Sequence, residues 1–376
     1  MSKSKFDLTY LSIDSVQEGV GSSQITPLIL GLAKRGKSIC LVTLEKTKPA
    51  KELLDTFESA GVVWLIKEFG KPGILGGIKR LNTIRRSIPD SSLLHGRSDV
   101  ATAAAIWSRV KVPVLWDVRS FWSDQRLAIR TAGWNRLTAQ GARMLENVAA
   151  KKSTAMTTLT YAAIPILEQR HTRIPDIKEV IPTCVQTTEF TSSPMPKIPI
   201  TCLLSGTFNN YYDLDRTKQI LDEIRKSIDL QVIWARPSES PLENLGVGED
   251  LIVTVSHSDM PKLVKGSHFG IAICKETQSV SLAASAPTKI GEFLASGRPV
   301  IVSSGLGDFD QMLPSSRAGL VIAPSDSLEG LAQRVDRLIS DSQTPDRCRT
   351  LAMLHFDMEE ALNRYERMYE QMLELV

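Results

Sequence analysis

Residues 284–308 constrain the fold more than any other stretch, and they read ASAPTKIGEFLASGRPVIVSSGLGD. Ile290, Phe293 and Leu294 recur at helical spacing. We expect Thr288 to cap this short helix and Gly297 to end it. The β-branched run at 299–302 follows at once and is typical of a strand buried in a parallel sheet. A helix that feeds directly into such a strand predicts an α/β fold.

Lys289 is unusual because it places a positive charge in the first turn of the predicted helix, where cations are disfavoured. An anionic ligand such as a diphosphate would remove this conflict, since helix N-termini bind anions. The alternative is a solvated surface lysine, and spacing alone favours neither. Gly305 and Gly307 open the loop after the strand and would let the backbone approach a ligand there.

The same alternation of strand and helix runs along the whole chain, twice over. Strands are predicted at 6–13, 38–44, 62–69, 92–95 and 112–118, and again at 200–205, 230–235, 251–255, 269–274 and 299–302. Between the two series, residues 183–199 are rich in Thr, Ser and Pro, which is typical of a linker. We therefore predict two doubly wound domains, at 1–182 and 200–355, with a last helical segment at 356–376.

Charge divides the chain in the same way. Residues 1–190 carry 27 Lys and Arg against 17 Asp and Glu, a net +10, and residues 191–376 carry 18 against 25, a net −7, which together give the +3 of the chain. A basic half can meet an anionic membrane surface or nucleic acid, but no nucleic-acid-binding motif is present, so no nucleic-acid partner is expected. The five scattered cysteines form no CxxC pair, which argues against a zinc site or a disulfide framework and favours the cytoplasm.

Residues 71–87 read KPGILGGIKRLNTIRRS, a basic amphipathic segment without an acidic residue. Such a helix can lie on anionic lipid. An ordinary surface helix would instead turn its apolar stripe to the sheet. We expect the stripe to pack on the sheet and leave the basic face for a membrane.

Two successive predicted strands end in polar clusters. His95 and Arg97 follow one strand, and Asp117 and Arg119 follow the next. A single histidine is more often structural than catalytic, but clusters at adjacent strand ends indicate a candidate cleft.

These motifs carry a family resemblance. The pattern PTK-x-GE-x-LA-x-G-x-PV of residues 287–300 resembles the donor-binding segment of group 1, GT4-like retaining glycosyltransferases of the GT-B fold. DVRSFWSDQR, beginning at Asp117, resembles another segment of that family, with Ser120 in place of its usual Gly. The resemblance runs from the first glycine-containing loop to Asp308.

The resemblance implies two Rossmann-like domains, sugar transfer from a nucleotide-sugar to a glycan or lipid-linked acceptor hydroxyl with retention, and no metal ion or other cofactor. It implies a role in surface polysaccharide or glycoconjugate biosynthesis. His95, Asp117 and Arg119 would serve the sugar or acceptor. Residues expected to meet the donor are Gly19, Gly21, Gly206, Arg236, Lys275, Ser285, Thr288, Lys289, Glu292, Gly305 and Gly307, with Lys289 on phosphate and Glu292 on ribose hydroxyls.

Two departures from the family pattern keep alternatives open. Ala284 stands where many members have a first glutamate, and the loop GTFNNYYDLDR lacks the usual phosphate-binding Arg and Lys. A sugar-nucleotide epimerase of the same fold, or a non-catalytic glycosyltransferase-like subunit, would also fit. We expect a cytoplasmic enzyme, peripherally attached to the inner face of a membrane through the basic segment.

Overall fold

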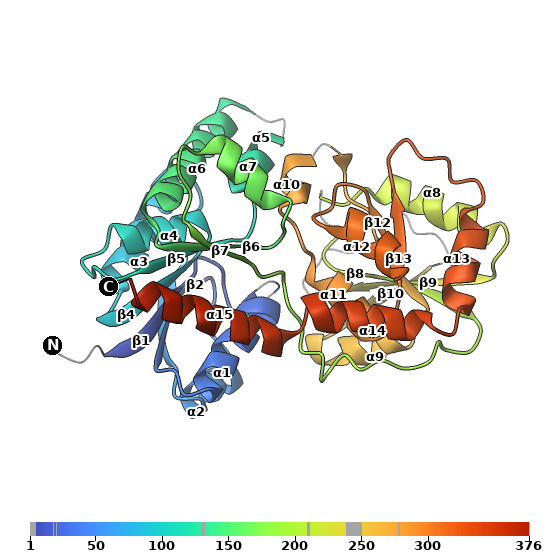
Figure 1. The fold of residues 1–376 in the computed structure, drawn as a ribbon, viewed down its shortest axis with the longest axis horizontal. Helices are drawn as coiled ribbons and strands as arrows, with labels where there is room; N and C mark the ends of the chain where they lie inside the picture. The colour runs from blue at the N-terminus through green and yellow to red at the C-terminus, as the bar shows by residue number, and fades with distance from the viewer. Residues whose placement is uncertain are drawn as a thin grey trace. The chain divides into compact units, whose positions relative to one another are not determined.

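The computed structural model describes residues 5–17, 19, 21–128, 132–208, 211–237, 250–276 and 279–375. Two residues of the GTFNNYY loop, Asn209 and Asn210, lie outside them. The chain forms two compact units, each built on one parallel sheet (Figure 1). The first comprises residues 1–182 and 358–376, and the second residues 183–357.

The first unit contains a seven-stranded sheet of order β3-β2-β1-β4-β5-β6-β7 in which all neighbours pair in parallel. Its strands are β1 (Phe6–Leu11), β2 (Ile39–Glu45), β3 (Val63–Glu68), β4 (Ser91–Arg97), β5 (Val114–Val118), β6 (Ala155–Thr158) and β7 (Ile177–Val180). Its helices are α1 (Thr26–Lys34), α2 (Lys51–Ser59), α3 (Ile74–Ser87), α4 (Ser98–Ile106), α5 (Trp122–Ala128), α6 (Ala132–Lys152), α7 (Ala163–Arg170) and α15 (Met358–Leu373), with a π-turn at Gly21–Ile25. The order reverses between β1 and β4, which is where doubly wound sheets bind ligands.

The second unit repeats this plan with six parallel strands in the order β10-β9-β8-β11-β12-β13. The strands are β8 (Ile200–Ser205), β9 (Leu230–Arg236), β10 (Leu251–Thr254), β11 (Phe269–Ala272), β12 (Val300–Ser303) and β13 (Gly319–Ile322). The helices are α8 (Leu214–Arg225), α9 (Met260–Lys265), α10 (Ser279–Ala283), α11 (Thr288–Ala295), α12 (Phe309–Ser316), α13 (Leu331–Ser340) and α14 (Thr344–His355), with a 3-10 turn at His257–Asp259. The fold class predicted from sequence, an α/β fold of two doubly wound domains, is confirmed.

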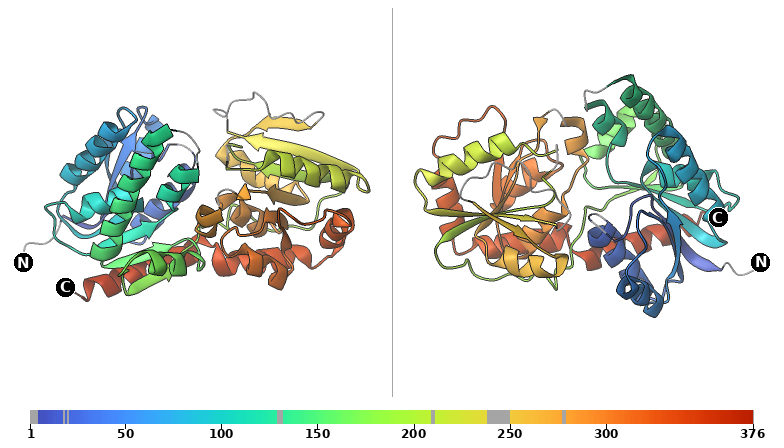
Figure 2. Two further views of the ribbon diagram at one scale, coloured as in Figure 1. Left: turned by 90° about the horizontal axis from the view of Figure 1, so that it is seen from above. Right: turned by 180° about the vertical axis from the view of Figure 1, so that it is seen from behind.

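Both faces of the second sheet are covered, because alternate residues of each strand enter different cores. Leu203 and Val302 join one apolar cluster, while Leu204 and Ile301 join the other. The views from above and behind in Figure 2 show the helices lying on both sides of the sheet. Since both faces are apolar, the polar side chains of the strands gather at the strand ends.

The segment 183–199, expected as a linker, belongs to the second unit and is fastened to it by two arginines. Arg298 is fully buried and donates hydrogen bonds to the carbonyl oxygens of Ser193 (2.8 Å) and Pro194 (3.0 Å). Arg349 donates to those of Thr187 (3.1 Å) and Phe190 (2.7 Å). Carbonyl oxygens of the segment therefore accept hydrogen bonds from both guanidinium groups and hold it on the second unit.

The predicted last segment, 356–376, contains one helix, α15, and the chain leaves the second unit between α14 and α15. Phe356 accepts a hydrogen bond from the Val185 N–H at 2.8 Å, and Asp357 accepts one from the Thr187 hydroxyl at 2.5 Å. From Met358 on, the chain packs in the first unit, where Leu362 lies against Gly31 of α1.

Two sequence expectations need correction. Pro287, not Thr288, is the N-cap of α11, and its side chain offers no capping oxygen. The apolar stripe of α3 packs only through its second half: Ile84 is buried, but Leu75 and Ile78 are 83% and 55% exposed. The reason is that the helix packs on α4 and β2 through that half. All five cysteines are buried and free.

Candidate functional site

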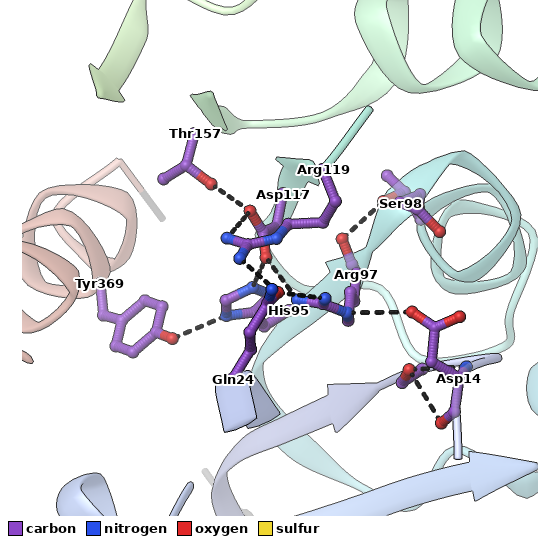
Figure 3. A network of polar contacts seen from close by, with 12 residues as sticks. Asp14, Gln24, His95, Arg97, Ser98, Asp117, Arg119, Thr157 and Tyr369 are labelled. Atoms are coloured by element: carbon purple, nitrogen blue, oxygen red, sulfur yellow. Dashed lines mark hydrogen bonds and ion pairs between the residues drawn. The ribbon is translucent and has the colours of Figure 1, made fainter. Parts of the chain in front are cut away.

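The polar network of the first unit lies at the carboxyl ends of β4 and β5, near the point where the strand order reverses (Figure 3). His95 lies inside β4 rather than after it, and its ring is fully buried. Its Nε2 is 3.4 Å from Oδ2 of Asp117, and its Nδ1 is 2.8 Å from the Tyr369 hydroxyl. An ionised carboxylate only accepts, so Nε2 carries the proton and Nδ1 accepts from Tyr369.

Asp117 is the centre of this network and is only 1% exposed. Its Oδ1 accepts from Thr157 at 2.9 Å and from Arg119 at 3.4 Å. Burial alone would raise the pKa of Asp117, but Arg119 and His95 outweigh it and hold that pKa well below its usual range. Burial lowers the pKa of His95, which keeps the imidazole neutral. Asp117 is thus an ionised carboxylate in a dry environment.

Gln24 joins the two arginines. Its Oε1 accepts from Arg97 at 2.6 Å and from Arg119 at 2.8 Å. Arg97 also donates to Asp14 at 3.1 Å. Gln24 and Asp14 come from the segment after β1, so that segment is positioned by Arg97 of β4 and by Arg119, which directly follows β5.

Gly19 and Gly21 have local structural roles in the same segment. Gly19 adopts φ +51°, and its carbonyl oxygen accepts from the hydroxyls of Ser22 and Ser23 at 3.0 Å. A Cβ at Gly21 would overlap the Ser15 carbonyl oxygen. Both glycines are required by a tight turn, which accounts for their presence without a ligand.

Lys289 connects two elements in the second unit. It lies in the first turn of α11, and its ammonium donates to the Ser205 carbonyl oxygen at the end of β8. Gly206 has φ +125°, and a Cβ there would lie 2.9 Å from Lys289 Nζ. The lysine is therefore neither free in solvent nor paired with a carboxylate; it brings a positive charge to the edge of the sheet where β8 ends.

Glu292 lies one turn further along α11 and is only 7% exposed. Burial raises the pKa of Glu292 to about 7, and the charge of Lys289 offsets this only in part. A buried carboxyl that titrates near neutrality, beside an ammonium and a helix N-terminus, is a typical feature of a ligand site.

Other predicted donor residues lie at the same edge. Arg236 ends β9, next to Gly206, whose N–H donates to the Ala235 carbonyl at 3.0 Å. The Lys275 N–H donates to the Tyr211 carbonyl at 3.1 Å, and the Ser285 hydroxyl lies 2.7 Å from that of Tyr211.

The two glycines after β12 have positive φ angles, 75° for Gly305 and 52° for Gly307. Their N–H groups are occupied: Asp310 accepts from Gly305 at 2.9 Å, and the Leu282 carbonyl accepts from Gly307 at 2.9 Å. These glycines therefore shape the loop, and no direct N–H donation to a ligand is available from them in this conformation.

Sequence reasoning missed several residues of both sites. Tyr369 in α15 and Gln24 before α1 complete the first network, and Phe208 and Tyr212 surround Lys289 in the second. The three aromatic residues of GTFNNYY were the available indication for the second site. Tyr365 and Tyr369, four residues apart on one helix face, were the indication for the first.

Asp213 is the N-cap of α8, and its side chain accepts from the Arg216 N–H at 2.9 Å. Within the described ranges, no three His, Cys, Asp or Glu side chains gather as a metal site would require. No helix among the described residues is both long and apolar enough to span a bilayer.

Comparison with known proteins gives the class of this fold. Residues 199–341 match the family model "Glycosyl transferases group 1". No curated protein matches the chain by sequence.

Solved structures are similar over nearly the whole chain. Sucrose-phosphate synthase from Thermosynechococcus elongatus has a TM-score of 0.73 at 12% identity, covering 98% of this chain and 99% of that one. Anabaena HepE, solved with UDP-glucose, has a TM-score of 0.68 at 11% identity, with 99% and 100% covered. WaaG, a glycosyltransferase involved in lipopolysaccharide biosynthesis, has a TM-score of 0.66 at 14% identity, with 95% and 98% covered. The protein has the GT-B fold.

Replacing Asp117 by Asn should destabilise the first unit by about 3 kcal/mol, because two arginines would lose a buried counter-charge. Hydrogen exchange at β4 and β5 measures this loss. Asp14→Asn is the matched control, since Asp14 also pairs with Arg97 but its side chain is 40% exposed; it should cost less than about 1 kcal/mol. Equal effects of the two substitutions would contradict the central role of Asp117.

Proposed function

We propose that the protein is a retaining glycosyltransferase that moves a sugar from a nucleotide-sugar to an acceptor hydroxyl. One observation carries the proposal: the segment that matches group 1 glycosyl transferases places the Lys289 ammonium, the α11 N-terminus and the buried Glu292 together at the carboxyl edge of its sheet. This combination suits a nucleoside diphosphate, with a cation for phosphate and a carboxylate for ribose hydroxyls. HepE was solved with UDP-glucose, which supports a nucleotide-sugar as donor.

In the proposed reaction, the bond between the anomeric carbon and the diphosphate oxygen breaks, and the acceptor oxygen bonds to the same face of the sugar. Lys289 and the α11 N-terminus would stabilise the charge that develops on the leaving diphosphate. The acceptor proton would pass to that leaving group. No enzyme-bound sugar intermediate is needed, so the protein's contribution is positioning and electrostatic stabilisation. We propose no metal requirement, since protein cations are available for this charge.

A non-catalytic subunit is the second candidate, and the first unit gives a specific reason for it. His95 and Asp117, expected to meet the sugar or acceptor, are 0% and 1% exposed, and both ring nitrogens of His95 face protein groups. Side chains buried among protein groups in this way would suit a protein that keeps the fold without chemistry.

The two candidates separate in one experiment. Thermal-shift screening against UDP, GDP, TDP, ADP and CMP identifies the base, because at equal concentration a tighter ligand stabilises the protein more. Incubation with the matching nucleotide-sugars should then give transfer or slow hydrolysis. Isomerisation would indicate an epimerase, and binding without turnover a non-catalytic subunit.

Lys289→Ala should weaken nucleoside diphosphate binding by roughly tenfold or more, because a charge-assisted hydrogen bond contributes about 1.5–3 kcal/mol. Calorimetric titration measures this. Lys226→Ala removes an exposed lysine from the same unit and serves as the control. Wild-type affinity in Lys289→Ala would refute the phosphate role.

Donor affinity should depend on pH through Glu292. With a pKa of about 7, roughly a tenth of this carboxyl is ionised at pH 6 and nine tenths at pH 8. The ionised form accepts ribose hydroxyls better, so affinity should rise with pH by up to about tenfold. Glu292→Gln should bind more weakly and keep only the pH dependence of the phosphate itself. If donor affinity changed with pH in the same way in wild type and in Glu292→Gln, Glu292 would not bind the ribose hydroxyls.

We also propose that the enzyme works in the cytoplasm on the inner face of a membrane, in surface polysaccharide or glycoconjugate biosynthesis with a glycan or lipid-linked acceptor. The supporting observation is α3, whose start exposes Leu75 and Ile78 beside Lys71 and Lys79. Exposed apolar and basic side chains on one short helix suit an anionic lipid surface.

The double variant Lys79→Gln, Arg86→Gln should reduce co-sedimentation with anionic vesicles roughly tenfold or more, at about 1 kcal/mol per basic residue. The control is Lys151→Gln, Lys152→Gln, at the exposed end of α6. Raised salt should release the wild type by screening. Equal binding to neutral vesicles, or none to anionic vesicles at low salt, would contradict the membrane proposal.

A further inference from the structure

The loop after β8 supplies aromatic rings to Lys289. Tyr212 lies under the ammonium, with Nζ 4.1 Å from the ring centroid, and Phe208 lies at 5.9 Å. Tyr212 itself is held in place, since it forms an isolated bridge with Cys274 and packs edge-on to Tyr211 at 5.8 Å. The ring is therefore a fixed part of the sheet edge.

Three groups together restrict the lysine head. The Ser205 carbonyl oxygen accepts a hydrogen bond from the Lys289 ammonium, and the Tyr212 ring covers one side of it. Gly206 has no Cβ, which leaves room for Lys289 Nζ. A lysine side chain has several rotatable bonds and loses up to about 2 kcal/mol of rotamer free energy when it is ordered. Cation–π contact offsets this by about 0.5–2 kcal/mol. The lysine is therefore ordered before any ligand arrives.

We propose that Tyr212 is a positioning residue that holds the Lys289 ammonium ready for a phosphate group. The loop after β8 would thus contribute to anion binding by ordering Lys289 rather than by adding its own cations. This inference rests on the proposed function for the identity of the anion, a nucleoside diphosphate. The contact between ring and ammonium does not depend on it.

The test compares Tyr212→Leu, which removes the ring but keeps an apolar side chain, with Tyr212→Phe, which keeps the ring. The first readout is competitive acylation of lysines followed by mass spectrometry, with exposed Lys151 as internal reference. Lys289 should acylate several-fold faster in Tyr212→Leu and within twofold of wild type in Tyr212→Phe. Equal acylation in the three proteins would overturn the proposal.

The second readout is the affinity for UDP and GDP by calorimetry. Tyr212→Leu should lose roughly three- to tenfold, whereas Tyr212→Phe should stay within twofold of wild type. An equal loss in both variants would mean that the hydroxyl acts, and no loss in Tyr212→Leu would mean that ordering Lys289 is unimportant; either result overturns the proposal. A wild type that binds neither nucleotide would count against the proposed function, and the acylation result would still decide whether Tyr212 holds Lys289.

Discussion

Each sheet of this protein is parallel and covered on both faces, and this constraint determines where chemistry can take place. Strand β2, for example, is buried along its whole length and so exposes no polar surface between its ends. Ionisable groups that belong to the sheet must collect at the strand ends, where loops and helix N-termini meet. Asp117 lies at the end of β5 in one unit, and in the other Lys289 reaches the end of β8 from the N-terminus of α11.

The two sites treat buried charge differently. Asp117 is surrounded by cations and hydrogen-bond donors, so it stays ionised and acts as a fixed counter-charge. Glu292 has one cation nearby, so burial dominates and its pKa rises to about 7. The cations around Asp117 keep it in one ionisation state, whereas the ionisation of Glu292 can change near neutrality and so respond to a ligand. For this reason, a donor site in the second unit is the better supported proposal, and an acceptor site in the first unit has less support.

The sequence predicted the fold well because hydrophobic periodicity and strand composition are local properties. The strand at residues 200–205 was located to the residue. Short elements without strong periodicity, such as α5, α10 and α12, were missed. Lys289 and Glu292 could be selected by motif, but Tyr369 beside His95 could not, because 274 positions separate them and only packing brings them together. The exposure of Leu75 likewise depends on where α3 meets α4, which no periodicity encodes.

The position of α15 has a consequence for synthesis. The helix is made after the whole second unit, yet it covers the core of the first: Tyr369 reaches His95, and Leu362 lies against α1. While the ribosome is translating residues 183–357, the first unit has its seven strands but lacks this helix. The ring of His95 then has no tyrosine partner, and apolar surface on α1 stays open. The part of the chain that is made first is therefore the last to be completed.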